Sequence, residues 1–246
     1  MTARFYVPQL SAAESCELTG SEWHHLAHVM RSEIGDRVVL FDGNGHEADA
    51  EITTLAKSRA SLRILARRTD LPEDESTIVL ATAVPKADRF RWLVEKATEL
   101  GVGRLIPLQT ARSVVSPGDV KLDKMRTTVI EACKQSGRNR LMRVEPTMNW
   151  ETLITTVVPT GSAFVADLSG ALLASAIAAA EPGRPVILIV GPEGGLTEGE
   201  LRLAIAAGAK SVSLGPRILR IETAALALAA IGGLRCSSRV PTAEPG

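Results

Sequence analysis

The amino-acid sequence predicts an α/β protein with a smaller β-rich region at its N-terminus. From residue 76 onward, short apolar runs alternate with segments of helical periodicity, a pattern typical of a mostly parallel sheet covered by helices. Before residue 70, strand-like runs are separated by turn sequences, which is typical of a small barrel. The length of 246 residues allows one large core or two modest ones, so it accommodates both regions.

Strand-like runs and one turn define the N-terminal region. Residues 37–41 are mostly apolar and lead into Asp42-Gly43-Asn44-Gly45, a strong turn sequence. Residues 47–52 and 61–65 then alternate polar and apolar side chains, as half-buried strands do. The runs 37–41 and 47–52, joined by the turn between them, therefore predict a strand pair.

A short helix and a linker complete this first region. Ser21 is placed to cap a helix that ends at Arg31. We therefore expect a barrel over residues 1–70. The polar, acidic and proline-containing residues 71–75 are expected to form a linker to the next domain.

The second domain is expected over residues 76–236, followed by a disordered tail over 237–246. A helix that begins with Asp88 as its cap has an apolar face and a glycine stop at Gly101. Pro107 indicates that its own strand lies at an edge of the sheet or that the proline is near a strand end. The expected strands are 78–81, 105–108, 164–166, 186–190 and 211–214, and the second expected helix is 119–136.

Two glycine-bearing loops carry most of the functional information. Residues 191–195 and 214–224 each follow a short apolar run and lead into a helical pattern, which is how an α/β sheet builds a ligand crevice at its carboxyl edge. Thr197, with Glu200 three residues later, predicts a capping box after the first loop. Neither the dinucleotide pattern Gly-x-Gly-x-x-Gly nor the phosphate loop Gly-x-x-x-x-Gly-Lys is present. The loops are consistent with a nucleotide-like cofactor that has adenosine and amino-acid ends, or with two tight turns.

The net charge is zero, but the charge is unevenly distributed. Residues 1–75 hold 8 Lys and Arg against 13 Asp and Glu, whereas residues 76–150 hold 13 against 7. The basic excess peaks between residues 121 and 143, at Lys121, Lys124, Arg126, Lys134, Arg138, Arg140 and Arg143. A local basic stripe on a neutral protein fits a polyanion bound at one face, or a solvated helix face.

Several classes of protein are disfavoured by composition. No run approaches the roughly 20 apolar residues of a membrane span, and the N-terminus lacks the apolar core of a signal peptide. An aromatic content of 3% argues against an RNA-binding sheet that stacks bases. Three widely spaced cysteines fit neither a disulfide framework nor a zinc site. His24 and His28 are one helical turn apart but lack a third ligand. We therefore expect a cytoplasmic protein with no membrane contact and no metal.

The two loop motifs occur in tandem, as residues 190–197 and 214–224, and are highly specific together. Further motifs are residues 95–102 and 131–138, and weaker matches at His25, Leu26, Val29, Met30 and Arg31. This combination resembles the RsmE family of the SPOUT superfamily of RNA methyltransferases over nearly the whole chain. Two positions depart from the pattern: Ile221 stands where threonine is expected, and residues 140–143 lack a proline often found there.

The resemblance implies an N-terminal PUA-like barrel and a C-terminal SPOUT α/β domain with a deep trefoil knot. It implies that S-adenosyl-L-methionine binds within the knot and that the protein is a homodimer. The implied reaction is N3-methylation of one uridine in 16S ribosomal RNA of the small ribosomal subunit. Pattern rules alone would predict an ordinary doubly wound sheet, because knots are nearly absent from folds.

The resemblance also assigns residues to roles. The expected cofactor-binding residues are Val165, Asp167, Val190, Gly191, Glu193, Gly194, Leu214, Gly215, Ile218, Leu219, Arg220 and Thr223. The expected RNA-binding residues are Arg4, His25, Arg31, Lys134, Gln135, Arg138 and Arg140. The cofactor residues come from the two glycine loops and from the strand over 164–166.

Three residues are the expected catalytic groups. Uridine N3 must lose its proton before it accepts a methyl group, so a cation near the base carbonyl oxygens would favour the anion. We expect Arg220 or Arg138 to supply this cation, and Glu222 to orient Arg220 or help to take the proton. Two alternatives stay open: a methyltransferase of the same superfamily that acts on transfer RNA, and a non-enzymatic RNA-binding or ribosome-assembly factor.

Overall fold

The computed structural model describes residues 2–10, 14–69, 78–115, 121–178 and 180–236. The chain divides into two compact units: residues 1–73 with 130–141, and residues 74–129 with 142–246. The expected linker over 71–75 and the expected tail over 237–246 lie outside the described residues. Residues 130–141 belong to the N-terminal unit, although sequence analysis placed them in the second domain.

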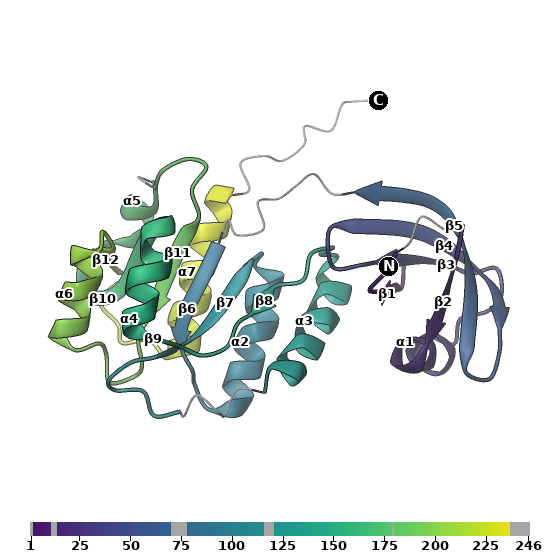
Figure 1. The fold of residues 1–246 in the computed structure, drawn as a ribbon, viewed down its shortest axis with the longest axis horizontal. Helices are drawn as coiled ribbons and strands as arrows, with labels where there is room; N and C mark the ends of the chain where they lie inside the picture. The colour runs from purple at the N-terminus through teal and green to yellow at the C-terminus, as the bar shows by residue number, and fades with distance from the viewer. Residues whose placement is uncertain (1, 11–13, 70–77, 116–120, 179, 237–246) are drawn as a thin grey trace. The chain divides into compact units, whose positions relative to one another are not determined.

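The N-terminal unit contains a five-stranded sheet in the order β1-β3-β4-β5-β2 (Figure 1). Its strands are β1 (Arg4–Tyr6), β2 (Ser15–Thr19), β3 (Arg37–Phe41), β4 (His46–Leu55) and β5 (Arg59–Thr69). All pairs are antiparallel except β1 with β3. The strand pair expected around the turn at 42–45 is confirmed as β3 and β4. One face of this sheet encloses a core that includes Phe5, Leu18, Leu40 and Ile52.

The helix expected from Ser21 to Arg31 is shorter and irregular. It consists of α1 (Gly20–His24) followed by one π-helical segment, η1 (His25–Val29). Thr19, not Ser21, stands at the N-cap, and its side chain makes no capping hydrogen bond. The chain leaves the helix at Arg31 with φ of +54°. Leu26 lies in the π-helical segment, and its side chain is fully buried in the core of the sheet.

The second unit is built on a parallel sheet in the order β12-β10-β11-β6-β7-β8, with β9 also paired to β7 (Figure 1). The strands are β6 (Ile78–Ala83), β7 (Arg104–Gln109), β8 (Arg143–Val144), β9 (Met148–Asn149), β10 (Ser162–Leu172), β11 (Val186–Val190) and β12 (Lys210–Ser213). The helices and turns are α2 (Ala87–Glu99), α3 (Leu122–Ser136), α4 (Trp150–Thr152), η3 (Leu153–Val157), η4 (Val158–Thr160), α5 (Leu173–Ala178), α6 (Glu198–Ala206) and α7 (Ile221–Cys236). Helix α3 belongs to this unit only as far as Val129, and its residues from Ile130 onward belong to the N-terminal unit. Every strand pair is parallel, which confirms the expected sheet type.

Helices cover both faces of this sheet. Helix α7 packs on β6, β11 and α2, whereas α4, η3 and α6 contribute to a core on the opposite face. Successive residues of a strand point to opposite faces, so Val79 and Ala81 join that second core while Ile78 lies beside α7 at Gly233. A strand covered on both faces reads as a continuous apolar run, which is why 78–81 and 186–190 were recognisable.

Pro107 lies inside the sheet rather than at its edge, since β7 pairs with β6 along its length. On the other side, β8 pairs with Arg104 and Leu105, and β9 pairs with Leu108 and Gln109. Pro107 therefore falls in the gap between two short partner strands. Its missing N–H group interrupts no ladder on that side.

Several boundaries differ from those expected. Helix α2 has Lys86 as its N-cap, and Asp88 lies in its first turn instead. Strand β10 extends to Leu172, well beyond the expected 164–166, with a shift in its pairing to β12 between Ala166 and Ala171. The capping box of Thr197 and Glu200 is confirmed. Within the described ranges, no helix combines the length and apolar character that a membrane crossing requires.

Candidate functional site: a cavity between two glycine loops

Strand order brings the two glycine loops together. Strand β10 lies between β11 and β12 and is parallel to both, so all three carboxyl ends meet at one edge of the sheet. Residues 191–195 follow β11, residues 214–220 follow β12, and Asp167 lies in the part of β10 next to these ends. Loops that are far apart in sequence therefore converge at the edge where α/β proteins bind ligands.

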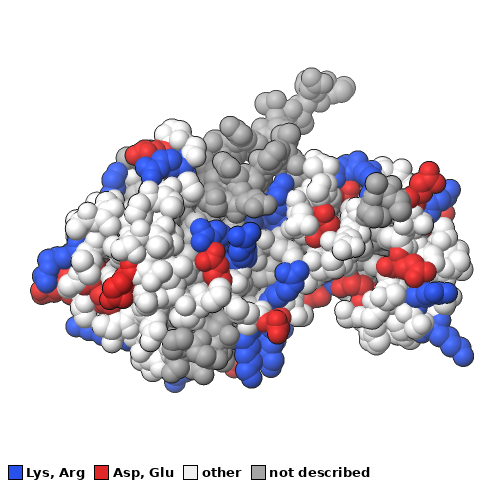
Figure 2. All heavy atoms as spheres, in the orientation of Figure 1, with Lys and Arg blue, Asp and Glu red and all other residues white. Residues whose placement is uncertain are grey.

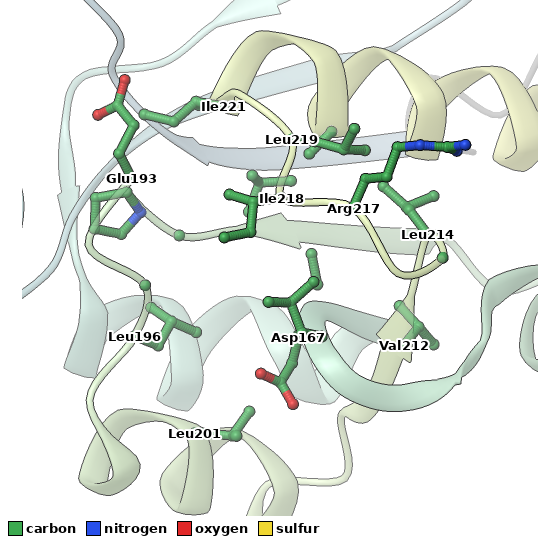
Figure 3. Close-up of a pocket in the computed structure, with 18 residues that line it drawn as sticks. Asp167, Glu193, Leu196, Leu201, Val212, Leu214, Arg217, Ile218, Leu219 and Ile221 are labelled. Atoms are coloured by element: carbon green, nitrogen blue, oxygen red, sulfur yellow. The ribbon is translucent and has the colours of Figure 1, made fainter.

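A cavity of about 220 Å³ occupies this edge (Figure 3). Apolar side chains from both loops and from α6 surround it, with Asp167, Glu193 and Arg217 as its charged members. Its lining residues are Ala166, Asp167, Leu168, Val190, Gly191, Pro192, Glu193, Gly195, Leu196, Leu201, Val212, Leu214, Gly215, Arg217, Ile218, Leu219, Ile221 and Ala224. In Figure 3, Ile218 lies opposite Asp167, whereas the guanidinium of Arg217 extends away from these two side chains.

Two glycines give the loops their shape. Gly195 has φ of +70° and Gly215 has φ of +105°, in the left-handed region that side chains disfavour. Both glycines line the cavity. The sequence thus needs glycine at these points to turn the chain around the ligand space.

Glu200 fixes the first loop to the start of α6. Its side chain is buried and accepts hydrogen bonds from the Thr197 N–H at 2.7 Å and the Thr197 hydroxyl at 2.9 Å. The N–H of Ala111, in the loop after β7, donates to its other oxygen at 2.8 Å. Burial alone would raise the pKa of Glu200, but these hydrogen bonds outweigh burial and hold the pKa below its ordinary value of 4.5.

The loop after β7 also holds the first glycine loop directly. Arg112 donates from Nη1 to the carbonyl oxygen of Gly194 at 2.7 Å. Together with the Ala111–Glu200 bond, this contact joins the loop after β7 to both ends of the turn over 194–200. Neither Ala111 nor Arg112 was expected from the sequence, because each lies more than 80 residues from its partner.

Asp167 presents a partly satisfied carboxylate to the cavity. Its Oδ2 accepts hydrogen bonds from the Ser211 hydroxyl at 3.3 Å and from the Ser169 N–H at 3.3 Å, and the Ser169 hydroxyl also contacts it. No hydrogen bond to Oδ1 is recorded among the described residues. This oxygen is therefore available to accept from a hydroxyl or ammonium group of a ligand.

Two acidic residues beside the cavity share one arginine. Arg89, in the first turn of α2, lies 3.4 Å from Glu222 and 3.7 Å from Glu193. Glu222 is 6% exposed, and its Oε2 is buried without a hydrogen-bond partner in the described part of the chain. Arg89 was not among the residues expected from the sequence. The sequence carried no local signal for it, because the pairing of β6 with β11 that brings the start of α2 to this sheet edge is set by the fold.

The expected cofactor residues fall into two groups. Those that line the cavity are Asp167, Val190, Gly191, Glu193, Leu214, Gly215, Ile218 and Leu219. Those outside the lining are Val165, which is buried in the sheet, Gly194, and the exposed side chains of Arg220 and Thr223. Leu196, Leu201 and Val212 line the cavity but were not expected, because they read as ordinary core positions in the sequence.

The expected RNA-binding residues, namely Arg4, His25, Arg31, Lys134, Gln135, Arg138 and Arg140, all belong to the N-terminal unit. Two of them already have acidic partners within that unit. Arg4 lies 2.9 Å from Glu47, and Lys134 lies 2.6 Å from Glu22. Arg31 and Gln135 are exposed. Figure 2 shows Lys and Arg side chains interspersed with Asp and Glu side chains on the face it presents.

The expected catalytic residues are distributed over both units. Glu222 lies beside the cavity, because its neighbour Ile221 lines the cavity. The carboxylate of Glu222 contacts Arg89. Arg220 precedes α7 and is exposed, and no side-chain hydrogen bond or ion pair is recorded for it within the described ranges. Arg138 belongs to the N-terminal unit. The pairing of Glu222 with Arg220 that sequence analysis considered is therefore replaced here by a pairing of Glu222 with Arg89.

Two family models match the chain. One, an RNA methyltransferase PUA domain, matches residues 18–65. The other, an RNA methyltransferase domain, matches residues 72–232, which is more than half of the sequence. With the structure, these matches confirm the expected α/β class with a PUA domain before a methyltransferase domain.

Similar proteins cover nearly the whole chain. It is 36% identical over 234 residues to the ribosomal RNA small subunit methyltransferase E of Bacillus subtilis, with 91% of each chain covered. The protein of that name from Mycobacterium tuberculosis is 34% identical over 240 residues, with 94% of this chain and 91% of that one covered.

Two solved structures resemble it closely. The first is the small subunit methyltransferase E of Neisseria gonorrhoeae bound to S-adenosyl methionine, with 33% identity, a TM-score of 0.83 and coverage of 94% of this chain and 96% of that one. The second is a Legionella pneumophila protein solved with the bound cofactor S-adenosylmethionine, with 29% identity, a TM-score of 0.81 and coverage of 96% and 98%.

Proposed function

Because the chain belongs to the ribosomal RNA small subunit methyltransferase E family, we propose that it methylates N3 of one uridine in 16S ribosomal RNA, with S-adenosylmethionine as the methyl donor. The observation that carries this proposal is the cavity enclosed by the two glycine loops at the carboxyl edge of the sheet.

The cavity fits the chemistry of this cofactor. Leu214, Ile218 and Leu219 of the second loop, with Leu196 just after the first, offer an apolar surface to a purine ring. Backbone groups of the glycine loops can bind its polar edge. Asp167, with its free oxygen, is suited to the hydroxyl or ammonium groups. The charged lining residues are Asp167, Glu193 and Arg217, so a cofactor with a net positive charge meets a net negative lining.

The bound cofactor supplies a methyl group on a sulfonium centre. The protein must orient the uridine and remove the proton from N3. We propose that Arg220 or Arg138 stabilises the negative charge that develops on the base carbonyl oxygens. Glu222 is the candidate proton acceptor, since its Oε2 has no hydrogen-bond partner within the described chain.

The test combines binding, transfer and loss of the product. Calorimetry should detect binding of S-adenosylmethionine, and the purified protein should transfer a labelled methyl group to 16S ribosomal RNA or to small subunits. Mass mapping of ribosomal RNA from a strain that lacks the gene should show one uridine without its N3 methyl group. A loss confined to transfer RNA would indicate the transfer-RNA alternative, and a protein that binds RNA but not the cofactor would indicate an assembly factor.

Arg220 can be tested by itself. Replacement of Arg220 by alanine should lower the turnover rate at saturating cofactor, because it removes a charge that acts in the transition state. The variant should bind the cofactor nearly normally, since Arg220 is absent from the cavity lining. Near-normal turnover would remove Arg220 from the mechanism and leave Arg138.

We further propose that the N-terminal unit binds the RNA. Arg31 is exposed, so it can reach a phosphate without breaking an internal ion pair. Arg31→Gln should weaken RNA binding and reduce the slope of log affinity against log salt by about 1. Cofactor affinity should stay unchanged. Lys134→Met is a poorer test, because loss of the ion pair with Glu22 would also destabilise the unit.

Finer features of the family complete the proposal. We propose a PUA-like barrel over residues 1–70, a deep trefoil knot that encloses the second glycine loop, a homodimer, and a cytoplasmic location. Strand β10 precedes β11 and β12 in the sequence but lies between them in the sheet, and this order supports the proposal of a knot at the second loop. Sedimentation equilibrium tests the homodimer, since it would give twice the mass of 26.1 kDa.

A further inference from the structure

Arg89 contacts two acidic residues, Glu193 and Glu222, that lie far from it in the sequence. Its Nη1 atom lies 3.4 Å from Oε1 of Glu222 and 3.7 Å from Oε1 of Glu193. Glu193 belongs to the first glycine loop, and Glu222 follows the second loop in the first turn of α7. One guanidinium on α2 therefore contacts both the first glycine loop and the start of α7, which follows the second loop.

The burial of Glu222 makes this contact more than a surface ion pair. The Glu222 side chain is 7% exposed, whereas Arg89 is 34% exposed and Glu193 is 51% exposed. A buried carboxylate is stable in its ionised form only with a cation or hydrogen-bond donors nearby. Among the residues that the structure describes, Arg89 supplies this partner, and the start of helix α7 adds a favourable dipole.

The contact leaves one carboxylate oxygen without a partner. Arg89 approaches Oε1 of Glu222, and Oε2 is buried with no hydrogen-bond partner among the described residues. Buried oxygens of this kind are uncommon and call for an explanation such as a catalytic role or an unseen ligand. The residues on either side of this part of α7, Ile221 and Ala224, line the cavity.

We propose that Arg89 is a positioning residue for methyl transfer, which holds the Glu222 carboxylate oriented with Oε2 free to accept a hydrogen bond or proton from the substrate. This rests on the proposed function. The distance of 3.4 Å is long for a hydrogen bond, and catalytic contacts often shorten when substrate binds. Glu193 provides the second contact, through which Arg89 also fixes the first loop.

Four variants and one control separate this role from a general structural one. The variants are Arg89→Met, Arg89→Lys, Glu222→Gln and the double variant Arg89→Met/Glu222→Gln. The control is Arg91→Met on the same helix, because Arg91 is exposed and no hydrogen bond or ion pair is recorded for it within the described ranges. Each protein is assayed for Tm without ligand, for S-adenosylmethionine affinity by calorimetry, and for kcat on small-subunit RNA.

The expected pattern is a loss in kcat that exceeds the loss in cofactor affinity. Arg89→Met should lower kcat by about 10- to 100-fold, which corresponds to about 1.4–2.8 kcal/mol, and change the cofactor Kd by less than about threefold. Arg89→Lys should recover part of kcat, since it keeps the charge but not the fork that reaches two carboxylates. The double variant should be no slower than the slower single variant, because both changes affect one unit.

Thermal stability gives an independent readout with a definite sign. Arg89→Met leaves the Glu222 carboxylate buried without its cation and should lower Tm, and Glu222→Gln in that background should restore part of the loss. The inference is overturned if Arg89→Met behaves as Arg91→Met in kcat, or if the two single effects on kcat multiply in the double variant. A wild-type protein that binds the cofactor but transfers no methyl group would overturn the proposed function, whereas the Tm cycle would still report the Arg89–Glu222 pair.

Discussion

Replacement of Glu200 by glutamine tests how the first glycine loop is held. The carboxylate accepts from the Ala111 N–H through one oxygen, and from the N–H and hydroxyl of Thr197 through the other. Glutamine keeps the shape but has a single carbonyl oxygen. Its NH2 group must therefore face one of the two backbone N–H donors, and one charge-assisted hydrogen bond is lost.

The size of the effect follows from that one bond. A hydrogen bond to a charged group contributes about 1.5–3 kcal/mol, so the free energy of unfolding should fall by about this amount. For a domain of 150–250 residues, about 1 kcal/mol shifts Tm by about 2–4 °C, which gives a fall of roughly 3–12 °C. Cofactor affinity should also fall, since Leu196 and Leu201 line the cavity on either side of the capping box.

The stability effect should depend on pH in one direction. The pKa of Glu200 in the folded protein lies below its ordinary value of 4.5. Its ionised form therefore stabilises the fold fully above about pH 4.5, and this contribution is lost as the pH falls through the folded-state pKa. The Tm difference between wild type and Glu200→Gln should be constant from pH 7 to 5 and shrink below pH 4.5.

The assay is thermal unfolding of both proteins by circular dichroism across that pH range. Glu198→Gln is a matched control, because Glu198 occupies the same first turn but its side chain is 92% exposed and forms a surface ion pair with Arg202 at 3.3 Å. That change should stay within about 0.5 kcal/mol. A Tm of Glu200→Gln equal to that of the control, or a difference that grows in acid, would refute the reasoning.

Three further predictions concern other parts of the molecule. Gly215→Ala, at φ of +105°, should cost about 1–2 kcal/mol and weaken cofactor binding in calorimetry. Gly199→Ala within α6 should not destabilise, because the nearest atom to an added Cβ would be Thr197 Oγ1 at an ordinary contact distance of 3.9 Å. Arg4→Met should lower the midpoint of urea unfolding, because the pKa of Glu47, which burial alone would raise, is lowered by the hydrogen bond from Arg4; equal midpoints would contradict this. Burial raises the pKa of Cys133 to about 11, so its peptide should be alkylated by iodoacetamide at pH 7.5 only after unfolding, as mass spectrometry would show.

Short-range patterns were enough to predict the sheet and its two loops. The apolar runs at 186–190 and 78–81, the capping box at Thr197, and the glycines around the cavity are all local features of the sequence. Each depends on residues within a few positions of one another, so propensity and periodicity report them directly. The strand order that joins the loops is not local, so periodicity does not predict it, and it is seen only in the folded structure.

Contacts between distant residues could not be predicted. Arg89 and Glu222 are 133 positions apart, and periodicity does not connect residues at such a distance. Within the basic stretch over 121–143, by contrast, a local pattern was present but was misleading at one position. Lys134 was expected to face RNA because its neighbours are basic, yet its ammonium group is buried between Glu22 and Glu131. A charge count ignores the acidic partners that tertiary structure brings from another segment.

The assignment of residues 130–141 to the N-terminal unit has a consequence for synthesis of the chain. In this segment, Asn139 and Lys134 contact Arg4 and Glu22, which leave the ribosome more than a hundred residues earlier. Domains generally fold as they emerge, but this one cannot close its last contacts until residue 141 is made. A fragment that ends at residue 70 would therefore lack part of its own structure. Expression trials should compare that fragment with one extended through residue 141.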